Sequence, residues 1–138
     1  MIKLITGHKG SGKTKKLIAA VHDAVEQSKG NVVCVEKGPT LTYDITHRAR
    51  LIDVDSYAIA GFDAFYGFLS GLCAGNYDLT DVFVDATLRI CGRDYEQLAD
   101  FFAKIAKLSE AMHTEFVFTV SCDDEELPAR VFEVAQKY

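Results

Sequence analysis

A glycine-rich stretch near the start of the chain has the residue types and the spacing that bind a phosphate chain. Residues 7–14 fit the pattern Gly-x-x-x-x-Gly-Lys-Ser/Thr at every fixed position. Glycines let successive backbone N–H groups curl around a di- or triphosphate and approach it closely. We expect Lys13 to reach the β- and γ-phosphates and Thr14 to offer its hydroxyl to Mg²⁺. The residues expected to contact the phosphates are Gly7, His8, Lys9, Gly10, Ser11, Gly12, Lys13 and Thr14.

The residues on either side of this stretch favour a binding loop over an ordinary turn. Residues 1–6 are mostly apolar and partly β-branched, which predicts a buried strand leading into the loop. Apolar residues then recur at helical spacing from Lys13 to about Ser28. The N-terminus of that helix would point its positive end at a bound anion. The pattern therefore has the strand-loop-helix context that a phosphate site requires.

Polar residues also stand at the ends of other predicted strands. Strands are expected at 31–36, which ends in Glu36, around 51–54, at 81–85, which ends in Asp85, and at 116–120, which Ser121 follows. Parallel strands present their carboxyl ends at one edge of the sheet, where ligands bind. We therefore expect Glu36, Asp85 and Ser121 to lie at the same edge as residues 7–14.

These motifs resemble those of the P-loop NTPase superfamily, with residues 7–14 as the Walker A motif and 81–85 as Walker B. The order of strands is similar to that of the RecA-like branch, and the pattern also resembles small bacterial P-loop ATP-binding proteins. The resemblance implies a three-layer α/β fold whose five-stranded, mainly parallel sheet has the order 3-2-4-5-1, with helices on both faces. It implies ATP and Mg²⁺ as ligands, with Asp85 holding Mg²⁺ directly or through water. It also implies Glu36 as the group that orients the attacking water, and Thr119 or Ser121 as a sensor, with Ser121 in contact with the nucleotide.

Two arginines follow Asp85 on a loop expected to rim the site. Arg89 and Arg93 could act in catalysis within one chain, act across a dimer, or pair with Asp94 on the surface. Ala86 follows Asp85 directly, so the second carboxylate that many other ATPase branches use as a base is missing there. Glu36 must then serve as the base, or hydrolysis is weak.

The rest of the chain supplies covering helices. Aromatic and aliphatic residues from Gly61 to about Gly75 form one helical stripe, and glycines at 67, 71 and 75 form another that could admit a second backbone, from this chain or from another subunit. Asp94 to Gln97 resembles a capping box at the start of a long amphipathic helix reaching Met112. A final short helix is expected after Pro128.

Length and composition limit the possible functions. A chain of 138 residues predicts one nucleotide-binding domain, 1–138, and its net charge of −5 argues against a nucleic-acid partner. No apolar run approaches the roughly 20 residues of a membrane span, and Met1 begins the first strand, so we expect a cytoplasmic protein with four buried, reduced cysteines. The sequence thus predicts a Mg²⁺-dependent ATP-binding protein, a slow ATPase coupled to a protein partner or to self-assembly into a homo-oligomer. A nucleotide-sensing regulatory module and a small-molecule kinase are the alternatives.

Overall fold

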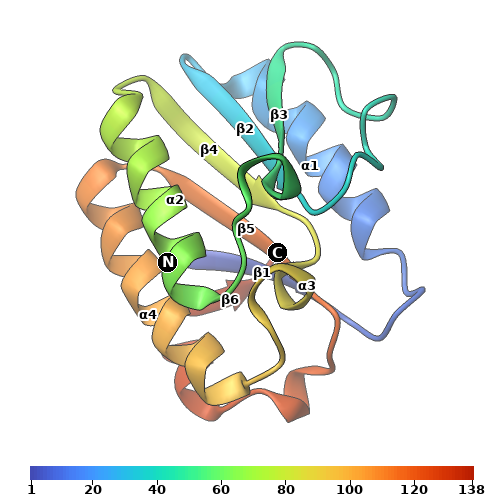
Figure 1. Ribbon diagram of the computed structural model, residues 1–138, viewed down its shortest axis with the longest axis vertical. Helices are drawn as coiled ribbons and strands as arrows, with labels where there is room; N and C mark the ends of the chain where they lie inside the picture. Colours follow the sequence, from blue (N-terminus) through green and yellow to red (C-terminus); the bar gives the residue numbers. More distant parts are fainter.

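A parallel β-sheet forms the middle layer of the structure, a computed structural model that describes residues 1–138 (Figure 1). Its six strands have the order β3-β2-β4-β5-β1-β6, and every neighbouring pair is parallel. The strands are β1 (Ile2–Thr6), β2 (Asn31–Glu36), β3 (Ala49–Asp53), β4 (Leu79–Val84), β5 (Glu115–Val120) and β6 (Ala135–Lys137). The α-helices are α1 (Lys13–Gln27), α2 (Phe62–Gly75), α3 (Thr87–Cys91) and α4 (Tyr95–Met112), and the 3-10 helices are η1 (Val54–Tyr57), η2 (Asp124–Glu126) and η3 (Ala129–Glu133).

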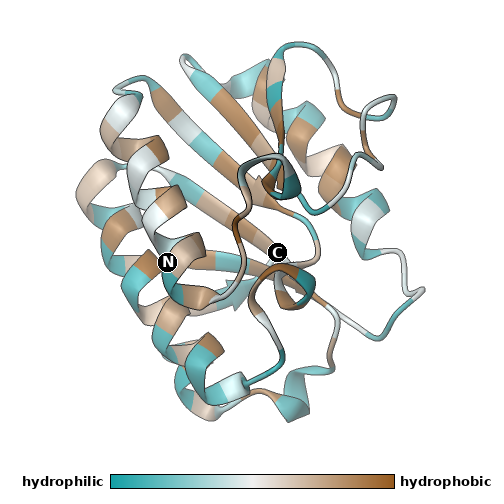
Figure 2. Ribbon diagram, in the orientation of Figure 1, coloured by the Kyte–Doolittle hydropathy of each residue, from teal (hydrophilic) through white to brown (hydrophobic).

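Each face of the sheet has its own apolar core, because successive strand residues point to opposite faces. On β2, Val32 and Cys34 pack with α1 in a cluster of 12 buried residues, whereas Val33 and Val35 belong to a cluster of 27 that includes α2 and α4. In Figure 2 brown bands run through the middle of the sheet with teal bands between them, and α1 and α4 also alternate between brown and teal. Near-continuous apolar strands are expected where a parallel sheet is covered on both faces. None of the helices has the length and apolar character that crossing a bilayer requires.

The predicted order 3-2-4-5-1 is confirmed for five strands, but the prediction of only five strands is wrong. The short helix expected after Pro128 is present as η3, but it ends at Glu133. Ala135 belongs instead to β6, which pairs with the outer edge of β1. Ala135 is buried opposite Ile2, and the Tyr138 N–H donates to the Leu4 carbonyl at 2.9 Å. Three residues are too few for an alternation pattern, so the free backbone groups of β1 decide the structure here.

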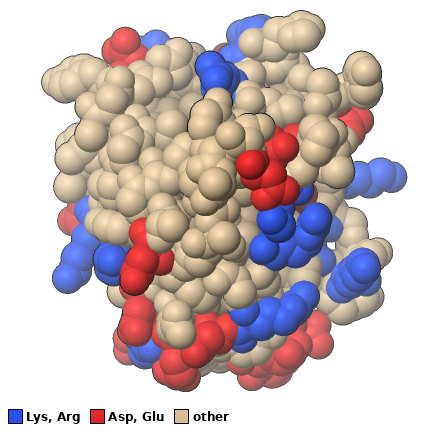
Figure 3. All heavy atoms as spheres, in the orientation of Figure 1, with Lys and Arg blue, Asp and Glu red and all other residues tan.

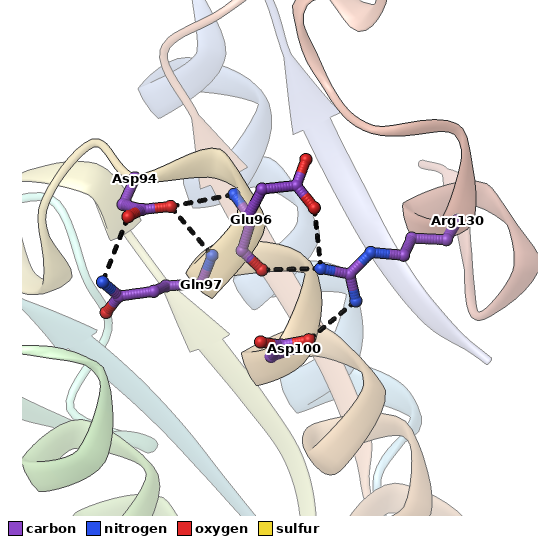
Figure 4. Close-up of polar contacts among 5 residues, drawn as sticks. All are labelled: Asp94, Glu96, Gln97, Asp100 and Arg130. Carbon is purple, nitrogen blue, oxygen red and sulfur yellow. Dashed lines mark hydrogen bonds and ion pairs between the residues drawn. The ribbon is translucent and has the colours of Figure 1, made fainter.

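The start of α4 holds the C-terminal segment in place (Figure 4). As predicted, Asp94 caps the helix, accepting hydrogen bonds from the Glu96 and Gln97 backbone N–H groups at 3.0 Å each. The Gln97 side chain donates to the Asp94 carboxylate at 3.1 Å instead of completing a capping box through the backbone. Arg130 of η3 donates to the Glu96 carbonyl at 2.9 Å, to the Glu96 carboxylate at 3.0 Å and to Asp100 at 2.7 Å. These contacts fix the path of the chain between β5 and β6.

The glycines of α2 do not admit another part of this chain. A Cβ added at Gly67, Gly71 or Gly75 would have no atom within 4 Å. The expectation of a close intramolecular backbone contact is therefore wrong, and the contact between subunits stays a prediction. Asp63 is the only charged residue of α2, and Figure 3 shows a broad surface without charged side chains in this part of the molecule.

Candidate functional site

The connection between β1 and α1 forms a glycine-rich loop, residues 7–12, at the carboxyl edge of the sheet. Gly10 and Gly12 have φ values of 86° and 89°, in the left-handed region that favours glycine. At Gly7 an added Cβ would lie 2.5 Å from the Ser11 hydroxyl oxygen, closer than atoms can approach. The Gly7 N–H donates to the Cys122 carbonyl at 2.9 Å. The loop is therefore folded back on itself and anchored to the segment that follows β5.

Lys13, the first residue of α1, points back into the loop. Its ammonium donates to the His8 carbonyl at 2.8 Å and lies 3.5 Å from the Ser11 hydroxyl oxygen. The side chain is 9% exposed, so most of its length is covered while the charge stays within the loop. A cation held against the loop, at the N-terminus of a 15-residue helix, creates a positive environment.

Asp85 joins the loop to two neighbouring strands. It follows the last residue of β4, and its Oδ1 accepts a hydrogen bond from the Thr119 hydroxyl of β5 at 2.9 Å. The Thr14 hydroxyl lies 3.3 Å from the same oxygen and 3.5 Å from Oδ2. The Ala86 N–H donates to the Thr119 hydroxyl at 2.7 Å, so that hydroxyl both donates and accepts. One carboxylate thus contacts the start of α1 and the end of β5.

Thr14 and Asp85 are the two oxygen-bearing side chains that could hold a magnesium ion here. Mg²⁺ takes oxygen ligands at about 2.0–2.1 Å in octahedral geometry, which places neighbouring ligands about 3 Å apart. The separation of 3.3 Å between the Thr14 hydroxyl and Oδ1 of Asp85 agrees with that spacing. No group of three or more His, Cys, Asp or Glu side chains is placed to hold a metal ion. The remaining ligands would therefore be water and phosphate oxygens, as is usual for Mg²⁺ at phosphate sites.

A cavity of about 650 Å³ opens above these residues. Its charged lining consists of five cations and one carboxylate: Lys9, Lys13, Lys15, Arg89, Arg93 and Asp85. Three hydroxyl residues, Thr14, Thr119 and Ser121, and the small residues Gly10, Gly12 and Ala86 complete it. Figure 3 shows Lys and Arg side chains gathered over the part of the molecule where α3 and the glycine-rich loop lie.

Helix α3 brings the two arginines to the cavity. Ala86 has a φ of 61°, which turns the chain sharply after Asp85, and Gly92, with a φ of 113°, ends the helix. Arg89 lies on this helix and not on an irregular loop, and Arg93 follows it. Neither guanidinium makes a hydrogen bond or ion pair within the chain, and Asp94 is bonded to α4 instead. The interpretation in which these arginines pair with Asp94 is therefore wrong.

Glu36 ends β2 but does not line this cavity. It is 2% exposed, and its Oε1 accepts hydrogen bonds from the Thr40 N–H at 3.0 Å, the Thr40 hydroxyl at 2.9 Å and the Leu41 N–H at 3.0 Å. In the structure this carboxylate braces the connection between β2 and β3. Its role as the catalytic base stays a prediction.

Most of the residues nominated from the sequence lie together in the cavity, with some exceptions. Gly7, His8 and Ser11 shape the loop from outside the lining. Lys15 lines the cavity but was not nominated, although its place after Thr14, on the first turn of the helix, is a usable signal. Comparison with models of known protein families finds no match to this chain, and comparison with curated protein sequences finds no similar protein.

Proposed function

We propose that this chain is a Mg²⁺-dependent nucleoside triphosphate-binding protein of the P-loop type, which hydrolyses ATP slowly. The supporting observation is the contact of Thr14 with Asp85 beside the glycine-rich loop. A hydroxyl and a carboxylate close to each other, next to a lysine whose ammonium lies against the glycine-rich loop, suit a metal-bound polyphosphate.

Different residues of the chain would bind the phosphates and the magnesium ion. The backbone N–H groups of the glycine-rich loop would donate to phosphate oxygens, and the Lys13 ammonium would exchange the His8 carbonyl for a phosphate oxygen. Thr14 and Asp85 would hold Mg²⁺, which would neutralise part of the negative charge of the phosphates. Thr119 would keep the Asp85 carboxylate oriented toward Thr14, because its hydroxyl bonds both Asp85 and the Ala86 N–H.

Slow hydrolysis is proposed because the cavity lining contains no carboxylate other than Asp85. The nominated base, Glu36, has Oε1 occupied by three hydrogen bonds from the connection to β3. This observation also favours the second candidate function, a nucleotide-sensing module that binds a triphosphate without turning it over. A partner protein or a second copy of the chain would then bind differently to the nucleotide-bound and nucleotide-free forms.

The test is Mg²⁺-dependent nucleotide binding and phosphate release by the purified chain and by Lys13→Ala. We expect Lys13→Ala to lose at least about tenfold in affinity, since a charge-assisted contact to phosphate is removed. Lys107→Ala is the matched control, because Lys107 is exposed on α4, away from the cavity. Turnover that rises with protein concentration would support an assembly-activated ATPase, and binding without turnover would support the sensing module. If both variants bind nucleotide like the wild type, the proposed function is wrong.

A further inference from the structure

We infer that the cavity recognises the triphosphate chain itself and leaves the base in solvent, so that ATP, GTP, UTP and inorganic tripolyphosphate bind with similar affinity. The inference rests on the proposed function and adds the chemical class of ligand that the site selects. It follows from which side chains line the cavity and from which of them already have partners.

The positive charge of the cavity comes from two separate parts of the chain. Lys9, Lys13 and Lys15 come from the glycine-rich loop and the first turn of α1, whereas Arg89 and Arg93 come from α3 and the residues after it. Of the five side chains, only that of Lys13 makes a hydrogen bond within the chain, and none is in an ion pair. Clustering cations without carboxylate partners is unfavourable unless an anion binds between them.

The same lining offers little to a nucleobase. A base is held by stacking on an aromatic face or by polar groups that read its edge. The only apolar side chain in the lining is the methyl group of Ala86. The large apolar side chains exposed on the molecule all lie outside the lining: Met1, Tyr43, Tyr57, Tyr77, Met112 and Tyr138. Thr119 is already bonded to Asp85 and the Ala86 N–H. Binding energy must therefore come from the phosphates.

The two arginines would hold the phosphate that lies farthest from the loop. A guanidinium presents paired N–H donors that match phosphate oxygens, and both arginines line the cavity without an ion-pair partner in the chain. The loop and Lys13 would hold a diphosphate alone, and the arginines in the same lining would contact a third phosphate. Removal of both arginines should therefore weaken triphosphate binding by roughly 10- to 100-fold and diphosphate binding by less.

The experiment is titration calorimetry with Mg²⁺ and five probes: ATP, GTP, UTP, ADP and inorganic tripolyphosphate. The proteins are the wild type, the double variant Arg89→Ala/Arg93→Ala, and the control Arg50→Ala, which removes an exposed arginine outside the cavity. We expect the dissociation constants of the four triphosphate probes to agree within about fivefold for the wild type and for the control. For the double variant, the affinity for these probes should fall toward that for ADP. Circular dichroism on each variant checks that it is folded.

Two results would overturn the inference while leaving the proposed function intact. One is Lys13-dependent binding of a single nucleotide at least about 30-fold tighter than the others. The other is ATP binding without detectable tripolyphosphate binding, because the base or ribose would then supply the affinity. Equal losses for ATP and ADP in the double variant would reject the assignment of the arginines to the third phosphate. Failure of every probe to bind would instead reject the proposed function.

Discussion

Replacing Thr119 with valine tests whether the contact between β4 and β5 organises the site. Valine has nearly the same shape as threonine but cannot bond Asp85 or the Ala86 N–H, which lie 2.9 Å and 2.7 Å from the Thr119 hydroxyl. Thr119 is 1% exposed, so water cannot easily replace the lost partners.

The expected cost follows from the two bonds. A hydrogen bond to a charged group contributes about 1.5–3 kcal/mol, and leaving a buried N–H unpaired costs about 1–3 kcal/mol. The bond between Thr14 and Asp85 remains, and the added methyl group gains some apolar burial, so the sum is reduced. We expect Thr119→Val to lower the free energy of unfolding by about 2–4 kcal/mol. Thr119→Ser keeps the hydroxyl and should lose only about 1 kcal/mol for the missing methyl group.

Urea unfolding followed by circular dichroism at pH 7 without nucleotide measures these values. The same proteins should then be titrated with nucleotide with and without Mg²⁺, and Thr119→Val should weaken the Mg²⁺-dependent part of binding most, since Asp85 is no longer oriented. A loss below about 0.5 kcal/mol for the valine variant, or equal losses for valine and serine, would refute the reasoning.

Three further results follow from packing and titration. Gly71→Ala should raise the free energy of unfolding by about 0.5–1 kcal/mol, because its added Cβ meets no atom within 4 Å. Gly30→Ala should lower it by roughly 2 kcal/mol or more, because its Cβ would lie 2.1 Å from the Asp78 carbonyl oxygen. Urea unfolding that gives the opposite signs would contradict this. The Lys137 ammonium at 2.8 Å and the Thr6 hydroxyl hold the pKa of Asp124 below its ordinary value of 3.8. The stabilisation is therefore present at neutral pH and is lost as the pH falls through the lowered pKa. Asp124→Asn should lower the free energy of unfolding by about 0.5–1.5 kcal/mol at pH 7, and urea unfolding at acidic pH should show a smaller difference from the wild type. Burial raises the pKa of Cys122 to about 11, and all four cysteines are buried. Iodoacetamide at pH 8 should therefore label the thiols only after the chain unfolds, and rapid labelling of the folded chain would count against this packing.

The helices and central strands could be predicted because their apolar patterns are long. The helix predicted from Lys13 to about Ser28 is α1, and the stripes at 61–75 and 95–112 are α2 and α4. Strand β3 begins two residues earlier than expected, at Ala49. As an edge strand it carries the exposed Arg50, and that polar residue hides its start.

Helix α3 and strand β6 could not be predicted, because tertiary contacts determine them. Helix α3 has five residues, and the N-terminus of α2 bonds to it through the Gly61 N–H and the Ile90 carbonyl at 3.0 Å. Strand β6 similarly depends on the free edge of β1. A single turn of helix or three strand residues carry too little periodicity to be recognised from sequence.

The site shows the same limit for single side chains. The strand-end argument places Asp85 and Ser121 in the cavity, but at the end of β2 the chain turns at Gly38, with a φ of 88°, and returns the Thr40 and Leu41 N–H groups to Glu36. Sequence identifies the edge of a sheet on which a residue lies, whereas competing local hydrogen bonds decide where its side chain points.

Two substitutions at Glu36 separate its predicted catalytic role from its bracing role. Glutamine keeps an oxygen that can accept hydrogen bonds from Thr40 and Leu41, so Glu36→Gln should largely keep the stability and the nucleotide affinity of the wild type. It should abolish turnover only if the carboxylate is the base. Glu36→Ala removes the brace and leaves the Thr40 and Leu41 N–H groups without this partner, which should cost about 2–4 kcal/mol in the free energy of unfolding. Unchanged phosphate release by Glu36→Gln, measured beside its unfolding curve, would show that Glu36 is not the base. An alanine variant as stable as the wild type would show that the brace is not needed for the fold.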